Sequence, residues 1–331
     1  MKQLYLFLIT FMLCAVNHAA AETKVMFLTA GQSNTDGRVP AKDLPDFLKE
    51  PIRMCKISYH CGYNPERAGR FYTFQAAAGG RGNSSRWTYD AVVYHHIAEK
   101  SGIPFYVVKC SQGGTSLDPM ADCSGRMAKT TADNGEKASI PFYGVYDADG
   151  TFRPMYGKGY HWSADSSFLA DTEIAGAVYE KDGKRFTGQS LLKAWIAAID
   201  AAIDSIEAGG DSVEIKAVMW HQGESDYKTP AGYHDSMKGM IAYVRRHIAE
   251  KLGDKKYLSL PFYLGTVPHS SRMYNADIEN AMKKLGRDDA NVHVIDLSDL
   301  SVQSDKLHFD AASAVIFGER LWKRMKKDMR F

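Results

Sequence analysis

The chain has 331 residues, with 41 basic side chains against 39 acidic ones and a formal net charge of +2. This balance gives no electrostatic reason to expect a nucleic acid partner. Hydrophobic residues make up 45% of the chain, which is enough for one large core, and α/β proteins of this size are often single domains. We therefore expect one domain over residues 23–331.

The N-terminus has the pattern of a secretory signal peptide over residues 1–22. Lys2 supplies a positive start, residues 4–16 form an apolar run, and residues 18–21 are small enough for cleavage near Ala21. The apolar run is too short to span a bilayer, and no later stretch is long and apolar enough to do so. The sequence therefore predicts a secreted or periplasmic protein with no membrane partner.

Four of the five cysteines lie beyond this segment, at Cys55, Cys61, Cys110 and Cys123. In an exported protein two local disulfides are expected, Cys55–Cys61 and Cys110–Cys123, although four cysteines allow three pairings. No C-x-x-C or H-x-x-x-H pattern accompanies them, so we expect no metal site.

Apolar, partly β-branched runs alternate with amphipathic segments along the rest of the chain. The expected strands cover residues 25–30, 52–58, 104–110, 213–220 and 261–267, with 292–297 as a candidate edge strand. The expected helices cover residues 88–100, 189–206, 231–252 and 311–327. This alternation predicts an α/β fold with a parallel sheet covered on both faces.

Residues 118–187 interrupt this alternation with a polar, aromatic-rich stretch that carries hairpin signals at 147–150 and 181–184. Neither end has the composition of a linker, so we interpret the stretch as an excursion of the same domain. Its aromatic residues could stack on sugar rings, but we expect most of them to form a small core of their own. Residues 61–86 are rich in glycine and predict a long loop that lacks the Gly-Lys-Ser/Thr ending of a phosphate-binding loop.

The first strand ends at Gly31-Gln32-Ser33-Asn34, so that a serine follows a buried strand. Parallel sheets bind their ligands at the rim formed by the carboxyl ends of the strands. Gly113-Gly114 follows the third expected strand and residues 221–226 follow the fourth, so these segments should meet Ser33 at one rim. The alternative is that Ser33 only caps a helix.

A fourth segment, residues 304–309, precedes the last helix and contains Asp305 and His308. A serine hydroxyl is a weak nucleophile that needs an adjacent base, and the base needs a group that orients it. His308 can accept the Ser33 proton, and Asp305 can hold the imidazole from three residues away. Glu224 is the alternative to Asp305 in that role.

A tetrahedral oxyanion needs fixed hydrogen-bond donors near the nucleophile. The backbone N–H groups of Ser33 and Gly113 and the side chain of Gln222 are the candidates. The residues that could support this site or contact substrate are Gln32, Asn34, Gly114 and Glu224. Three arginines, Arg38, Arg81 and Arg86, could contact a substrate carboxylate. We expect each of them instead to be a loop residue exposed to solvent.

The motifs Gly31-Gln32-Ser33-Asn34, Gly113-Gly114-Thr115-Ser116, Trp220-His221-Gln222-Gly223-Glu224-Ser225-Asp226 and Asp305-Lys306-Leu307-His308-Phe309 occur in this order. In this the chain resembles the SGNH hydrolase superfamily, and within it carbohydrate esterase family 6 and the sialate O-acetylesterase group. The resemblance implies a three-layer α/β/α, flavodoxin-like fold with about five parallel strands. It also implies ester hydrolysis through an acyl-serine, with no metal or organic cofactor.

By the pattern of that family, Ser33 is the nucleophile, His308 the base and Asp305 its partner, while Gly113 and Gln222 complete the oxyanion hole. Many members of the superfamily have asparagine where this chain has Gln222, and glutamine is expected in the carbohydrate esterase branch. The resemblance thus implies a carbohydrate O-acetylesterase, acting on an acetylated plant polysaccharide such as xylan. The alternatives are a sialate O-acetylesterase and, from another class, a non-catalytic glycan-binding relative.

Overall fold

The computed structural model describes residues 21–60, 67–77, 86–118, 127–131, 137–141, 144–146, 152–154, 160–165, 177–181 and 184–329. A seven-stranded sheet with the order β16-β15-β14-β1-β6-β3-β4 forms its centre. These strands are β1 (Thr23–Gly31), β3 (Ile52–His60), β4 (Tyr72–Phe74), β6 (Phe105–Ser111), β14 (Ser212–His221), β15 (Phe262–Gly265) and β16 (Val292–Ile295). All neighbours pair in parallel except β3 and β4, which are antiparallel.

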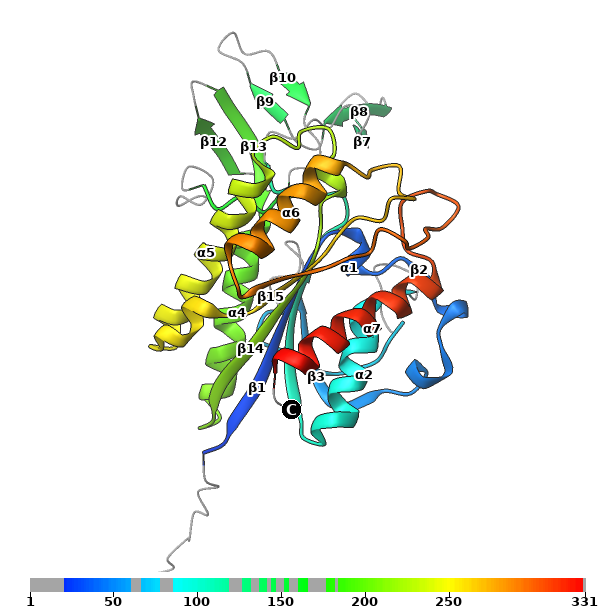
Figure 1. The fold of residues 1–331 in the computed structure, drawn as a ribbon. Helices are drawn as coiled ribbons and strands as arrows, with labels where there is room; N and C mark the ends of the chain where they lie inside the picture. The colour runs from blue at the N-terminus through cyan, green and yellow to red at the C-terminus, as the bar shows by residue number, and fades with distance from the viewer. Residues whose placement is uncertain are drawn as a thin grey trace, which may run out of the picture.

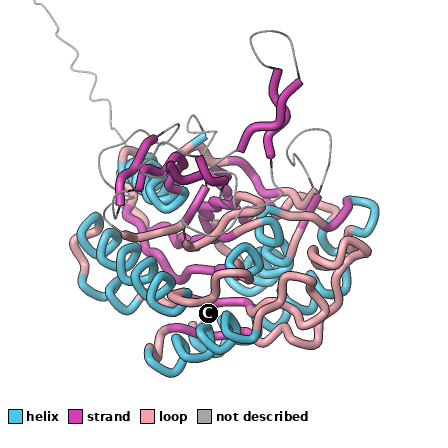
Figure 2. Tube along the Cα trace, turned by 90° about the horizontal axis from the view of Figure 1, so that it is seen from above, coloured by secondary structure: helices cyan, strands magenta, loops and turns pink. Residues whose placement is uncertain are grey.

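Helices cover both faces of this sheet (Figures 1 and 2). The helices are α1 (Ser33–Asp36), α2 (Tyr89–Ser101), α4 (Leu191–Glu207), α5 (Tyr233–Lys251), α6 (Ala276–Asp288) and α7 (Ala311–Asp328). Apolar residues of α4, α5 and α6 form one core with the sheet, and those of α2 and α7 form a second core on the opposite face. The three-layer α/β/α fold expected from the sequence is confirmed.

Strand β1 shows why the sequences of the central strands are continuous apolar runs. Its side chains alternate between the two cores, so that Met26 and Leu28 face one and Phe27 the other, all fully buried. A strand covered on both faces gains hydrophobic stabilisation from every residue, in contrast to a half-exposed strand.

The structure differs from the expectation in two elements. The sheet has seven strands rather than about five. Strand β16 confirms the candidate edge strand at residues 292–297, whereas the short β4, antiparallel to β3 at the opposite edge, was not expected. Helix α6 was not expected, although Asn275 caps its first turn by accepting a hydrogen bond from Asp277 N.

The excursion forms small sheets that lie beyond the carboxyl ends of the central strands (Figure 1). Its described strands are β7 (Met127–Thr131), β8 (Lys137–Pro141), β9 (Gly144–Tyr146), β10 (Phe152–Pro154), β11 (Tyr160–His161), β12 (Ala177–Lys181) and β13 (Lys184–Ser190). Trp162 is fully buried, with ring centroids 6.0 Å from Trp195 and 5.0 Å from Trp220. This tryptophan therefore fixes the excursion to the main core.

The predicted disulfide between Cys55 and Cys61 is wrong. Cys55 is a free, buried thiol in β3, which stays extended as far as His60. Five strand residues span roughly 16 Å, whereas disulfide Cα atoms lie about 4.4–6.8 Å apart. Cys123 lies outside the described residues, so the pairing with Cys110 stays a prediction.

The predicted signal peptide, residues 1–22, lies almost wholly outside the described residues as well. In the part of the chain that the structure describes, no helix combines the length and the apolar character needed to cross a membrane.

Candidate active site

The geometry of the turn after β1 determines where Ser33 lies. Gly31 ends the strand with φ +146°, and a Cβ there would lie 2.1 Å from the carbonyl oxygen of His221 and 2.5 Å from Thr35 Oγ1. Only glycine fits such an approach. The chain therefore turns at once into the one-turn helix α1 and places Ser33 at the carboxyl edge of the sheet.

Ser33, His308 and Asp305 lie together in the structure although 275 positions separate the first two in sequence. His308 Nε2 is 2.9 Å from Ser33 Oγ, and His308 Nδ1 is 2.6 Å from Asp305 Oδ2. The other carboxylate oxygen, Asp305 Oδ1, accepts the backbone N–H groups of Leu307 and His308 at 2.9 and 3.1 Å. The turn therefore orients the carboxylate, and the carboxylate orients the imidazole.

The charges and burial around Ser33, His308 and Asp305 suit His308 to the role of general base. Burial lowers the pKa of His308, against the raising effect of Asp305, and nearby Arg38 lowers it further. Burial alone would raise the pKa of Asp305, but hydrogen bonds from His308 and the turn outweigh it and leave that pKa lowered. At neutral pH Nδ1–H thus donates to a carboxylate, and Nε2 is left to accept the Ser33 proton.

We expect activity to be lost in acid as His308 becomes protonated. Because its pKa lies below the ordinary 6.5, kcat/KM should be level around neutral pH and fall with an apparent pKa under 6.5. The profile is measured with 4-nitrophenyl acetate, with circular dichroism at each pH to show that the fold persists. An acid limb centred above 6.5 would contradict this account of the histidine.

Two backbone N–H groups next to the serine are available to an oxyanion. Ser33 begins helix α1, whose first N–H groups lack partners within the helix. In the described part of the chain, neither Ser33 N nor Gly113 N donates a hydrogen bond. A Cβ on Gly113 would lie 3.2 Å from Ser33 Cβ, so the two backbones approach closely. Gly114, with φ +74°, continues the turn.

The expected role of Gln222 needs correction. Its Nε2 donates to the Thr115 carbonyl at 3.1 Å and to Asp226 Oδ2, and its Oε1 accepts from Tyr233 OH at 3.1 Å. The side chain is fully buried. Both amide protons are therefore in use, and Gln222 braces the segment after β6 instead of presenting a donor to an oxyanion.

Asp226 is a buried residue that braces the loops around the site, as its place in the motif after β14 predicts. Besides Gln222 it accepts the backbone N–H groups of Leu117 and Asp118, each at 3.0 Å. Burial raises its pKa to about 7, against the lowering effect of these hydrogen bonds. Asp226 thus joins the turn after β14 to the segment that follows Gly113.

The structure also decides between Asp305 and Glu224 as partner of His308. Asp305 lies on the imidazole, whereas Glu224 Oε1 contacts Asn34 Nδ2 at 2.7 Å. Gln32 supports the same turn, because its Oε1 accepts Ser225 N at 3.2 Å.

Arg38 is a fixed cation beside this trio. Its Nη1 pairs with Asp36 Oδ2 at 2.5 Å, and its Nη2 lies 2.7 Å from where a Cβ on Gly113 would be. The side chain is 22% exposed. The sequence predicts a solvated loop residue here, but the folded chain pairs Arg38 with Asp36 and places its guanidinium next to Gly113.

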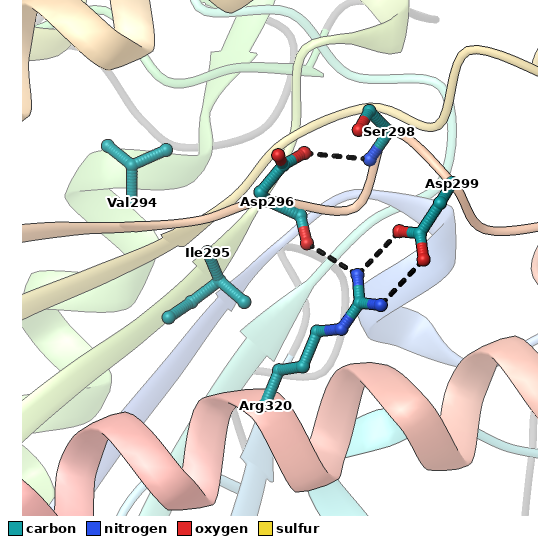
Figure 3. Close-up of a pocket in the computed structure, with 6 residues that line it drawn as sticks. All are labelled: Val294, Ile295, Asp296, Ser298, Asp299 and Arg320. Carbon is teal, nitrogen blue, oxygen red and sulfur yellow. Dashed lines mark hydrogen bonds and ion pairs between the residues drawn. The ribbon is translucent and has the colours of Figure 1, made fainter.

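One pocket lies apart from the expected site residues. A pocket of about 460 Å³ lies at the end of β16, lined by Val294, Ile295, Asp296, Ser298, Asp299 and Arg320 (Figure 3). Arg320 already donates to Asp299 at 2.6 and 2.7 Å and to the Asp296 carbonyl at 2.8 Å, and no expected site residue lines the pocket. Within the described ranges, no group of three or more ligating side chains could hold a metal ion.

A family model described as "Carbohydrate esterase, sialic acid-specific acetylesterase" matches residues 179–327. The match includes the turn after β14 and His308, while Ser33 and Gly113 lie outside it. Over these residues the chain is similar to the sialic acid-specific acetylesterases, in agreement with the resemblance that its motifs predict. A search of curated proteins gave no match.

Solved structures support the fold of this chain. A protein from Arabidopsis thaliana superposes with TM-score 0.58 at 16% identity, over 92% of this chain and 99% of that one. NanS superposes with TM-score 0.55 at 12% identity, over 94% of this chain and 99% of that one. At these identities the likeness concerns the fold alone.

Proposed function

We propose that this esterase is a secreted or periplasmic carbohydrate O-acetylesterase that works through an acyl-serine. The observation that carries the proposal is the continuous contact from Ser33 Oγ through His308 to Asp305, at 2.9 and 2.6 Å. A protein that only binds glycans has no need of a nucleophile, a base and an orienting carboxylate in contact.

In the proposed reaction, Ser33 Oγ attacks the acetyl carbonyl carbon while its proton passes to His308 Nε2. The N–H groups of Ser33 and Gly113 hold the oxyanion. The bond from the carbonyl carbon to the sugar oxygen then breaks, and His308 returns the proton to that oxygen. Water, deprotonated by His308, attacks the acetyl-serine and releases acetate, after which the proton returns to Ser33. These steps need no cofactor.

The test is acetate release from acetylated xylan, O-acetylated sialic acid and 4-nitrophenyl esters of increasing acyl length. We expect release from at least one acetylated sugar and a preference for acetate over longer acyl groups. A folded protein that releases no acetate from any of them while binding a glycan would overturn the proposal in favour of a glycan-binding relative.

Two substrate classes remain candidates. Acetylated plant polysaccharide such as xylan was expected from the compact single domain. Two observations favour O-acetylated sialic acid instead, namely the description of the matched family and the cation of Arg38 above Gly113. Sialic acid carries a carboxylate that a fixed guanidinium can bind, whereas acetylated xylose units carry none.

If Arg38 binds a substrate carboxylate, Arg38→Gln should lower kcat/KM for O-acetylated sialic acid by about 10- to 100-fold, the value of one charge-assisted contact. The variant should hydrolyse two uncharged substrates, the methyl ester of O-acetylated sialic acid and acetylated xylan, at nearly the wild-type rate. Arg246→Gln, on the exposed part of α5, is the matched control. Equal losses on neutral and acidic substrates would instead assign Arg38 to positioning Gly113.

A further inference from the structure

A buried histidine–glutamate pair lies behind the candidate site, at the end of β14. His221 and Glu224 are both fully buried. His221 Nδ1 lies 3.1 Å from the carbonyl oxygen of Gly265, and its Nε2 lies 3.1 Å from Glu224 Oε1. The ring is therefore held from both sides, by the backbone at the end of β15 and by the Glu224 carboxylate.

The charge of Glu224 is stabilised locally. Burial alone would raise its pKa, but attraction to His221 and hydrogen bonds from His221 and Asn34 outweigh this and leave the pKa lowered. A buried charge of this kind is costly unless it is paired. The mechanism proposed above makes no use of the pair, so another reason for it is needed.

Asn34 connects this pair to the segment that carries His308. Its Nδ2 donates to Glu224 Oε1 at 2.7 Å and to the Leu307 carbonyl at 3.4 Å, and its Oδ1 accepts Phe309 N at 3.1 Å. A carboxylate only accepts hydrogen bonds, so Glu224 forces the NH₂ of Asn34 toward itself and its oxygen toward Phe309. The amide thereby holds the backbone on both sides of His308.

We propose that Glu224 is a positioning residue that acts through Asn34 to hold His308 Nε2 against Ser33 Oγ. The inference rests on the proposed function, because His308 is the base there. A displacement of about 1 Å in a reacting group can cost about 100-fold in rate. The pair thus supports the reaction without touching substrate.

The first test is Glu224→Gln, which keeps the shape of the side chain and removes its charge. We expect kcat for 4-nitrophenyl acetate to fall by about 10- to 100-fold with KM almost unchanged. The matched control is Asp90→Asn, which breaks the buried Asp90–Lys109 ion pair, with an N–O distance of 2.6 Å. In the described part of the chain neither residue has a hydrogen bond to residues 305–309. The Asp90→Asn variant should lower thermal stability and leave kcat unchanged. A Glu224→Gln variant with wild-type kcat would overturn the proposal.

The second test asks whether Glu224 works through Asn34. Asn34→Ala keeps both members of the buried pair and should lower kcat by a similar factor, so it also serves if Glu224→Gln does not fold. The double variant should be no slower than Asn34→Ala alone, because the two residues act in series. Wild-type kcat in Asn34→Ala, or losses that multiply in the double variant, would contradict the relay.

A readout without activity separates this inference from the proposed function. Hydrogen exchange of the Phe309 amide, measured in a Ser33→Ala background, should accelerate in both Glu224→Gln and Asn34→Ala. Unchanged exchange would refute the positioning role. Retained hydrolysis by Ser33→Ala would refute the nucleophile and leave the positioning measurement intact.

Discussion

Ser33→Ala is expected to lower kcat/KM for acetate release by about 10⁴- to 10⁶-fold, because no other group would form the acyl intermediate. The residual rate would come from binding and the oxyanion donors alone. Substrate affinity and thermal stability should change little, since the lost hydroxyl contacts His308 and supports no core packing.

Ser225→Ala is the matched control for this variant. Ser225 lies on the same rim, is buried, and its Oγ has no hydrogen-bond partner in the described part of the chain. Removal of this hydroxyl should leave kcat/KM within about two-fold of the wild-type value, since no described polar contact is lost. If Ser33→Ala kept more than a few per cent of the wild-type rate, the acyl-serine mechanism would be wrong.

His308→Ala is expected to lower kcat by a similar factor, about 10⁴- to 10⁶-fold, because Ser33 then lacks its base. Serine and histidine act as one unit, so the double variant Ser33→Ala with His308→Ala should be no slower than either single variant. Rates are measured as acetate release at neutral pH and, for the histidine variant, again with added imidazole.

The control for the histidine variant is His247→Ala. His247 Nε2 lies 2.8 Å from Asp200 Oδ1, and this half-buried contact joins α5 to α4. That variant should hydrolyse at the wild-type rate. Losses that multiply in the double variant would mean that Ser33 and His308 contribute independently, in conflict with their contact.

The fold could be predicted because the residue pattern within each short segment indicates the helix or strand that the segment forms. Buried strands such as residues 213–220 appear as apolar runs, and helices such as α4 show an apolar stripe. Helix α6 had the same signal, with Ile278, Met282 and Leu285 at helical spacing after the capping Asn275. Strand β4 had none, because three residues with largely exposed side chains carry no periodicity.

The candidate site likewise has a part that the sequence predicts and a part that it does not. The turn from Asp305 to His308 is local, and the structure shows the contact that its spacing predicted. The role of Gln222 depends on Thr115, Asp226 and Tyr233, which come from three separate elements. Sequence spacing does not show where such an amide points, so resemblance supplied a role that the contacts of this chain do not support.

The central claim is that Ser33 is the nucleophile, and labelling with a 4-nitrophenyl phosphonate tests it most directly. Such a phosphonate forms a stable tetrahedral adduct with an activated serine. Mass spectrometry of the intact protein and of its peptides should show one adduct per chain on Ser33, parallel loss of acetate release, and no adduct in His308→Ala. An adduct on another residue, or full labelling at Ser33 with acetate release unimpaired, would contradict the account.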